Sequence, residues 1–137
     1  MGIKEESMEF FRDLFVLVGR VLISGMFLWG AYEKIRNWSG AMAYMKARKV
    51  PQLKIVLPVS IGLGIVGGLS VFFGWHAHFG ALLLLIVAIP SALTLHRFWK
   101  FPADEQEMEK VVFMREIAVI GGLFLLLALG AGHFIVR

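Results

Sequence analysis

Residues 95–116 read LHRFWKFPADEQEMEKVVFMRE, and this stretch is the only long polar segment between two long apolar runs. It begins with His96 and Trp99 where one apolar run ends, and it ends with Arg115 and Glu116 inside the next run. Charged side chains that far into an apolar run are costly in lipid, so they need a structural or functional reason. The stretch therefore predicts a connection at one membrane face, with polar residues at the ends of two membrane-spanning helices.

The overall composition also favours a membrane protein. Of 137 residues, 58% are hydrophobic and only 18% are charged, whereas a soluble domain averages about 45–50% apolar and about 25% charged residues. The chain has no cysteine, which excludes disulfides, thiolate metal sites and iron–sulfur ligation on this chain. The formal charge of +4 comes from basic residues that flank apolar runs instead of forming a stripe, so we expect no nucleic-acid binding.

The apolar residues gather in blocks of about twenty, the length that crosses a hydrocarbon core of about 30 Å. We expect an all-α integral membrane four-helix bundle that forms one domain over residues 1–137. The connection after the second span is very short, which predicts an antiparallel helical hairpin. The expected spans are residues 14–35, 55–74, 79–95 and 111–135.

The first long loop predicts a short additional helix. Its sequence SGAMAYMKARKVP, residues 39–51, is typical of a helix that lies in the membrane interface, with Ser39 as its N-cap. In the second long loop, Asp104 and Glu107 have the spacing of a capping box, so we expect the last helix to begin near Glu105.

The distribution of Lys and Arg predicts the orientation. Both long loops are rich in basic residues, whereas the short hairpin connection has none. The positive-inside rule therefore predicts that both long loops face the cytoplasm and that both termini lie outside a plasma or inner membrane. Residues 1–13 lack the basic start and the cleavage site of a signal peptide, so we expect no processing.

Small residues predict where helices pack closely. Ser60, Gly64 and Gly68 recur every four residues in the second span, and Ala118 and Gly122 repeat the spacing in the fourth. Such a pattern permits close approach of two helix backbones. It is consistent with packing inside one bundle and with contact between copies in a homo-oligomer.

Polar residues at three helix ends form the candidate ligand site. Glu33 and Lys34 end the first span, His96 ends the third, and Arg115 and Glu116 begin the fourth at the same membrane face. Partly desolvated charges persist only when they are paired, so we expect Glu116 to form a network with Lys34, Arg115 or His96. The alternative is anchoring, in which basic side chains and the interfacial Trp99 sit at the headgroup level.

Arg20 lies deeper in the first span, about 20 Å from Glu33 along the helix. We expect Arg20 to face the bundle interior or a wet crevice, or to extend outward to the headgroups, with a structural role favoured over a ligand role. His76, His78 and His133 fall on the opposite side of the membrane from His96. Loop histidines are more often plain polar residues than ligands, so we expect no metal site.

Taken in order, these motifs resemble the DoxX family of small four-span membrane proteins. Two departures from the family pattern concern charge. Family members often carry a glutamate at the position of Gly64 and an asparagine at the position of Glu116. The motifs that carry the resemblance are Gly19-Arg20, Glu33-Lys34-Ile35, Ala43-Tyr44-Met45 with Val50-Pro51, Gly67-Gly68, His96 with Phe98-Trp99, and Arg115 with Gly121-Gly122.

The resemblance implies an association with membrane oxidoreductase systems and with quinones. Under this interpretation the chain is a quinone-interacting subunit that depends on a redox partner protein, because it has no thiols and no Gly-rich dinucleotide fingerprint of its own. The alternative is a non-catalytic membrane scaffold, assembly factor or small-molecule carrier. The sequence alone leaves both functions open.

Overall fold

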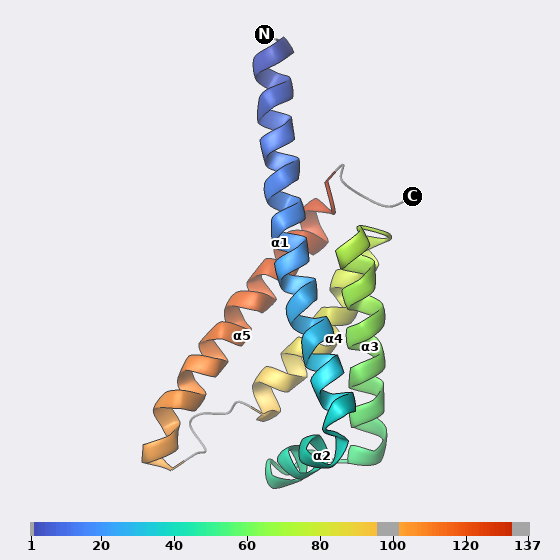
Figure 1. The fold of residues 1–137 in the computed structure, drawn as a ribbon. Coiled ribbons are helices and arrows are strands. Elements are labelled where there is room, and N and C mark those ends of the chain that lie inside the picture. Colours follow the sequence, from blue (N-terminus) through green and yellow to red (C-terminus); the bar gives the residue numbers. More distant parts are fainter. Residues whose placement is uncertain (1, 96–101, 133–137) are drawn as a thin grey trace.

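A computed structural model describes residues 2–95 and 102–132, and nearly all of these residues are helical, with no strand among them (Figure 1). The expectation of an all-α protein is confirmed. Four of the helices are long and apolar enough to cross a membrane, and the short α2 follows the first of them. The helices are α1 (Gly2–Arg36), α2 (Trp38–Ala47), α3 (Leu53–Phe73), α4 (Ala77–Leu95) and α5 (Ala103–Leu129).

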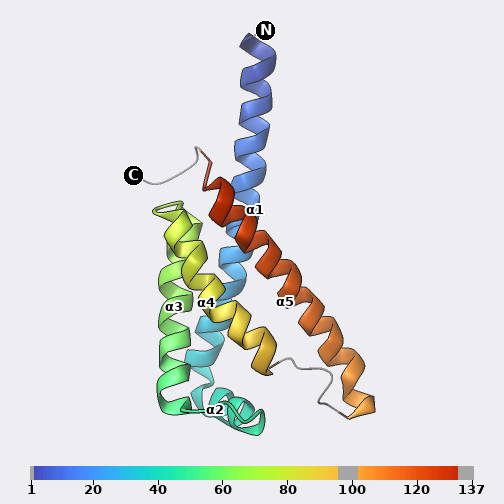
Figure 2. The same cartoon turned by 180° about the vertical axis from the view of Figure 1, so that it is seen from behind.

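The helices form a bundle with two distinct ends. The turn between α3 and α4 marks the hairpin end, and α2 lies across the opposite end, here called the α2 end (Figure 1). Helix α3 packs against both α1 and α4, and α4 also packs against α5. Helices α1 and α5 approach each other near the hairpin end and diverge toward the α2 end, as the views from both sides show (Figures 1 and 2).

Two clusters of buried side chains hold the bundle together. The cluster nearer the hairpin end joins α3, α4 and α5 through residues such as Val71, Leu84 and Leu123, none of which is exposed. The cluster at the α2 end joins α1, α2 and α3 through Ala31, Met45 and Leu57. Helix α2 is therefore fixed to the bundle by its apolar face, as expected for an interfacial amphipathic helix.

Glycines set the closest helix crossings. A Cβ atom built at Gly68 would lie 2.8 Å from Leu28 of α1, and one built at Gly64 would lie 4.0 Å from Ala31 of the same helix. The small-residue stripe of α3 therefore faces α1 inside the bundle. Gly122 of α5 also faces α1, because its Cβ would lie 3.2 Å from Ile23.

The tightest crossing lies between α3 and α4. A Cβ at Gly80 would lie 2.6 Å from the Ser70 hydroxyl oxygen and 3.0 Å from the Gly67 carbonyl oxygen. The Ser70 hydroxyl donates a hydrogen bond to the Trp75 carbonyl oxygen, and it lies 3.1 Å from that of His76. Gly80 thus leaves room for the hydroxyl that holds the hairpin turn.

The helices differ in their bounds from the expected spans and caps. Helix α1 begins at Gly2 and includes the charged lead as well as the expected span at residues 14–35, because no helix breaker separates the lead from the apolar run. Helix α2 begins at Trp38 with Asn37 as its N-cap, so Ser39 lies inside it. The Asn37 N–H donates a hydrogen bond to the Glu33 carbonyl, and the Asn37 carbonyl accepts one from the Ala41 N–H. Helix α1 therefore passes into α2 without a loop.

The bounds of α5 also differ from expectation. It begins at Ala103, and the Pro102 carbonyl accepts hydrogen bonds from the N–H groups of Glu105 and Gln106. Pro102 is therefore the N-cap, and Asp104 lies in the first turn of the helix. It ends at Leu129, several residues before the expected end at residue 135, because Gly130 adopts a φ of 84° that does not continue a helix.

The Gly80 crossing gives a stability test. Gly80→Ala should lower the free energy of unfolding by about 1–3 kcal/mol, because the new methyl group overpacks a crossing that includes backbone. Gly62→Ala is the matched control, since nothing lies within 4 Å of a Cβ built at Gly62. Thermal unfolding in detergent measures both, and a Gly80→Ala protein as stable as the control would contradict the crossing.

Candidate functional site

Arg20 lies inside the bundle, where its side chain is only 2% exposed. Its Nε donates to the Val71 carbonyl at 3.0 Å, Nη2 to that of Phe72 at 3.0 Å and Nη1 to that of Ala131 at 2.7 Å. These carbonyls belong to the C-terminal end of α3 and to the residues just after α5. The last carbonyls of a helix have no partner within that helix and carry partial negative charge, so a buried cation is stabilised there.

The sequence left open whether Arg20 faces the bundle interior, a wet crevice or the headgroups. In the structure its side chain lies in the bundle interior. Arg20 joins α1 to the ends of α3 and α5. His78 acts in a similar way, since its Nδ1 donates to the Leu127 carbonyl of α5 at 2.5 Å. These interactions at the hairpin end are structural.

No metal centre is found in the part of the chain that the structure describes. Among residues 2–95 and 102–132, no group of three or more His, Asp or Glu side chains is arranged to hold an ion. His96 and His133 lie outside these ranges. The expectation of no metal site therefore stays a prediction.

Lys34 of α1 and Glu116 of α5 line one cavity near the α2 end. This central pocket has a volume of about 210 Å³ and is also lined by the hydroxyl-bearing residues Ser60 of α3 and Ser91 of α4. Lys34 and Glu116 thus bring side chains of opposite charge to one pocket from two helices. The remaining walls are mostly apolar, among them Met26, Phe27, Val87 and Ala88.

Two further cavities share Lys34 and Ser91 with the central pocket. One of about 420 Å³, here called the vestibule, is lined by Glu33, Asn37 and Tyr44 as well as by Glu116. It is the more polar of the two and lies beside α2. The other, of about 270 Å³, is here called the α3–α4 groove, because most of its walls are apolar residues of those two helices. Lys34 and Ser91 therefore stand where three cavities meet.

The α3–α4 groove faces the surroundings of the bundle. Ile55, Val59 and Ile86 line it, and between 50% and 61% of each of these residues is exposed. In a membrane such apolar surface contacts lipid, so the groove offers a path from the bilayer to Lys34.

The other expected site residues are placed differently. Glu33 lines the vestibule, where it also pairs with Arg36 of the next helical turn at 3.9 Å. Arg115 is exposed on α5 and lines none of the cavities described here, whereas Lys34 and Glu116 line two of them together. The expected charge network stays a prediction. His96 and Trp99 lie outside the described residues.

An ion pair that the sequence did not predict joins α2 to α5. Arg48 Nη2 lies 2.7 Å from Glu109 Oε1, and both side chains are less than a fifth exposed. The Arg48 guanidinium also lies 4.0 Å above the Tyr44 ring. Burial raises the pKa of Tyr44, with Glu109 raising it further and Arg48 opposing both. The pair bridges the divergent end of α5 to the rest of the bundle.

Comparison with known proteins agrees with this architecture. A model of the DoxX family matches residues 15–97, more than half of the chain. The chain belongs to the DoxX family. It is a multi-pass membrane protein, with four helices suited to cross a membrane. The matched region contains Arg20, Lys34, Ser60 and Ser91, whereas Glu116 lies beyond it.

Two relatives are similar over most of this chain. Inner membrane protein YqjF of Escherichia coli is 29% identical over 127 residues, covering 93% of this chain and 92% of the relative. ER-derived vesicles protein ERV29 of Saccharomyces cerevisiae is 26% identical over 122 residues, covering 89% of this chain but only 32% of the yeast protein. No solved structure matches the chain.

The Arg20 contacts predict a specific loss of stability. Arg20→Lys should lower the free energy of unfolding by about 3 kcal/mol, because hydrogen bonds to a charged group contribute about 1.5–3 kcal/mol each and an ammonium group lacks the fork geometry. Arg36→Gln is the control, since its side chain is 68% exposed. Thermal unfolding in detergent provides the comparison. If Arg20→Lys unfolds like the wild type, the carbonyl contacts do not hold the hairpin end.

Proposed function

We propose that this DoxX-family protein binds a quinone at Lys34 and Glu116, as a subunit of a membrane oxidoreductase system. The supporting observation is the meeting of three cavities of different character at Lys34 and Ser91. A quinone site needs donors for a ring carbonyl, an apolar path for the tail and a route for protons from water. Each cavity matches one of these needs.

The central pocket suits the ring. The Lys34 ammonium and the Ser91 hydroxyl can each donate a hydrogen bond to a carbonyl oxygen, while Phe27 and Val87 supply apolar walls. Of the other polar residues that the sequence placed in the candidate site, Arg115 lines none of the three cavities and His96 lies outside the described residues. Trp29 of α1 lines none of the three cavities; it is 63% exposed and packs on Tyr32.

The other two cavities suit the tail and the protons. An isoprenoid tail fits the α3–α4 groove, whose exposed apolar residues continue into the bilayer. Glu116 lines both the central pocket and the vestibule, so its carboxylate can pass protons between water beside α2 and the ring. Reduction to the quinol consumes two electrons and two protons. In this proposal the electrons come from a partner protein that carries flavin, haem or an iron–sulfur centre.

A pocket-filling variant tests the binding site. Gly30 lines the central pocket, and nothing lies within 4 Å of a Cβ built there. Gly30→Leu should therefore occupy the pocket without straining the helix and abolish binding of a short-tailed quinone, measured by titration of the purified protein in detergent. Gly25→Leu is the matched control on α1, since its Cβ also meets nothing within 4 Å and it lines none of the cavities described here.

Charge variants then separate the roles of the two residues. Lys34→Gln should weaken quinone binding by about tenfold, the effect of losing a charged hydrogen bond. Glu116→Gln should leave binding within a few-fold and slow quinol formation in membranes that contain the redox partner. If Gly30→Leu and Gly25→Leu both bind quinone like the wild type, the quinone proposal fails. A non-catalytic scaffold or a carrier of another molecule is then the better interpretation.

We also propose that the α2 end faces the cytoplasm of an inner membrane, as the positions of the basic residues favour. The cysteine-free chain allows a direct test with single cysteines at Lys46 and Trp75, both exposed and at opposite ends of the bundle. In intact cells a membrane-impermeant maleimide should label Trp75→Cys, whereas Lys46→Cys should react only after the membrane is opened. The reverse labelling pattern overturns this orientation.

A further inference from the structure

A separate groove lies between α1 and α5 at the hairpin end. It has a volume of about 400 Å³ and shares no residue with the three cavities around Lys34. Its walls are mostly apolar, with Phe15 and Ile23 on α1 and Leu125 and Leu129 on α5, and Arg20, which is hydrogen-bonded inside the bundle, also lines it. The proposed quinone site leaves this groove unexplained.

Arg12 gives the groove a charged end. It is exposed and lines the groove one turn before Phe15 on α1. From Arg12 to Ile23 the helix rises by about 16 Å. An occupant that follows the groove therefore has a polar end at Arg12 and an apolar part that extends along the spanning part of α1. This describes an amphipathic molecule aligned with the bilayer lipids.

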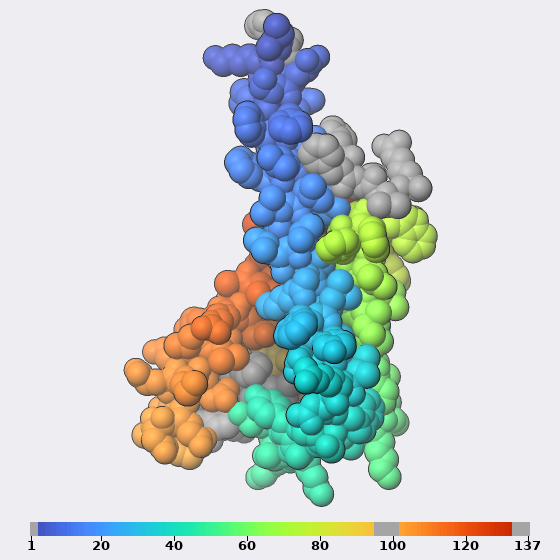
Figure 3. All heavy atoms as spheres, in the orientation of Figure 1, coloured from blue at the N-terminus to red at the C-terminus, as the bar shows by residue number. Residues whose placement is uncertain are grey.

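The charged residues near Arg12 favour some lipid headgroups over others. Glu9 is exposed and lies three positions before Arg12, which places both side chains on one face of α1. Residues 2–13 contain two basic and four acidic residues, a net charge of −2. A purely anionic headgroup is repelled by this segment. A headgroup with a phosphate and a primary ammonium group complements both Arg12 and Glu9, because its N–H groups can donate to the Glu9 carboxylate, which the quaternary ammonium of choline cannot do. The first turns of α1 stand clear of the other helices (Figure 3), and Glu9 and Arg12 are both exposed.

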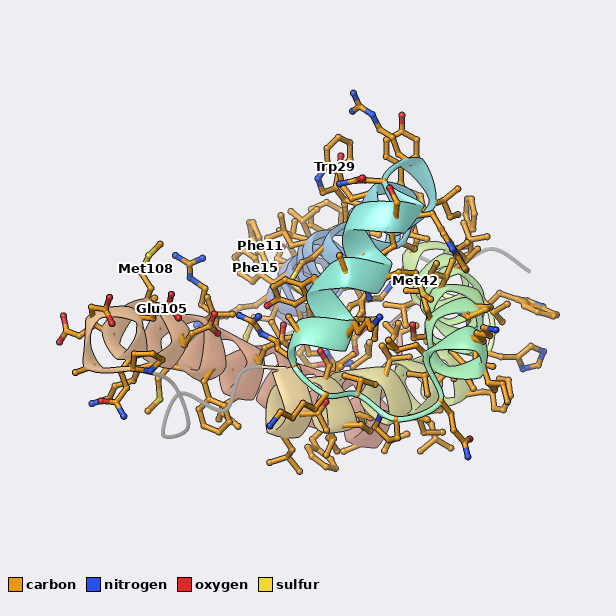
Figure 4. The ribbon with its side chains drawn as sticks, turned by 90° about the horizontal axis from the view of Figure 1, so that it is seen from below. Phe11, Phe15, Trp29, Met42, Glu105 and Met108 are labelled. Carbon is orange, nitrogen blue, oxygen red and sulfur yellow. The ribbon has the colours of Figure 1, made fainter. Side chains whose placement is uncertain are left out.

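From this complementarity we propose that the α1–α5 groove binds a zwitterionic phospholipid with an ethanolamine headgroup. The phosphate lies at Arg12, the ammonium group lies at Glu9, and one acyl chain occupies the apolar groove against Phe15 and Leu125. Phe15 points away from the bundle axis beside Phe11, on which it stacks (Figure 4). The lipid fills the space between two helices that otherwise contact each other sparsely.

Glycine positions again provide a matched pair of variants. Gly19 lines the groove, and a Cβ built there meets nothing within 4 Å, so Gly19→Leu fills the groove. Gly121 also has nothing within 4 Å but does not line the groove, so Gly121→Leu is the control on α5. Leu125→Trp fills the groove from the opposite wall, and it serves as the second variant if Gly19→Leu does not fold.

The first experiment measures lipid retained by the full chain. The protein is purified in mild detergent, and bound phospholipid is quantified by native mass spectrometry and by extraction. Wild type and Gly121→Leu should retain about one ethanolamine phospholipid per chain. Gly19→Leu or Leu125→Trp should retain about tenfold less, since the acyl chain loses several buried methylene groups. Equal retention in all variants overturns the proposed groove.

The second experiment tests the headgroup. Detergent-purified protein is titrated with phospholipids that share the same acyl chains and carry ethanolamine, choline or glycerol headgroups. Wild type should bind the ethanolamine lipid most tightly. Glu9→Gln should reduce its preference over choline by about two- to fivefold, and Arg12→Gln should weaken all three by a similar factor, as expected for exposed ion pairs. A preference for the anionic glycerol headgroup overturns the assignment.

Discussion

The buried guanidinium of Arg20 is the interaction on which the arrangement of the helices depends. In a bilayer every backbone polar group needs a partner within the protein, and the carbonyls at a helix end have none of their own. Arg20 donates to such carbonyls at the C-terminal end of α3 and just after α5, so one side chain from the middle of α1 holds the ends of two other spanning helices together. Its own charge is stabilised by the same contacts.

The Arg20 contacts hold the helices together at the hairpin end, whereas α1 and α5 are apart at the opposite end. Helix α5 diverges from α1 toward the α2 end, where the Arg48–Glu109 ion pair connects it to the rest of the bundle. The space between the diverging helices is partly filled by side chains and partly left as the cavities that contain Lys34 and Glu116. The candidate site is therefore a consequence of how the bundle is held together, and opposite charges on two helices meet there.

The glycines of this bundle serve two different purposes. At Gly68 and Gly80 a side chain would collide with a neighbouring helix, so glycine permits the helices to cross closely. At Gly19 and Gly30 a side chain would enter a cavity, so glycine keeps space for an occupant. A small-residue pattern in the sequence does not separate these purposes, because the distinction depends on what lies opposite each glycine.

The sequence by itself determined the number of spanning helices, the short helix between the first two and the family, because apolar length and local periodicity carry that information. It also placed Lys34 and Glu116 among the polar residues at one membrane face, and the two residues line the same pocket. Whether Glu116 pairs with Lys34, Arg115 or His96 stays a prediction. Helix ends were less predictable, as Ser39 and Gly130 show, because hydrogen bonding between adjacent segments sets them. Only the tertiary structure decided the Arg20 contacts, the Arg48–Glu109 pair and the place of Ser91. These contacts join residues up to 111 positions apart, and their geometry follows from how whole helices pack.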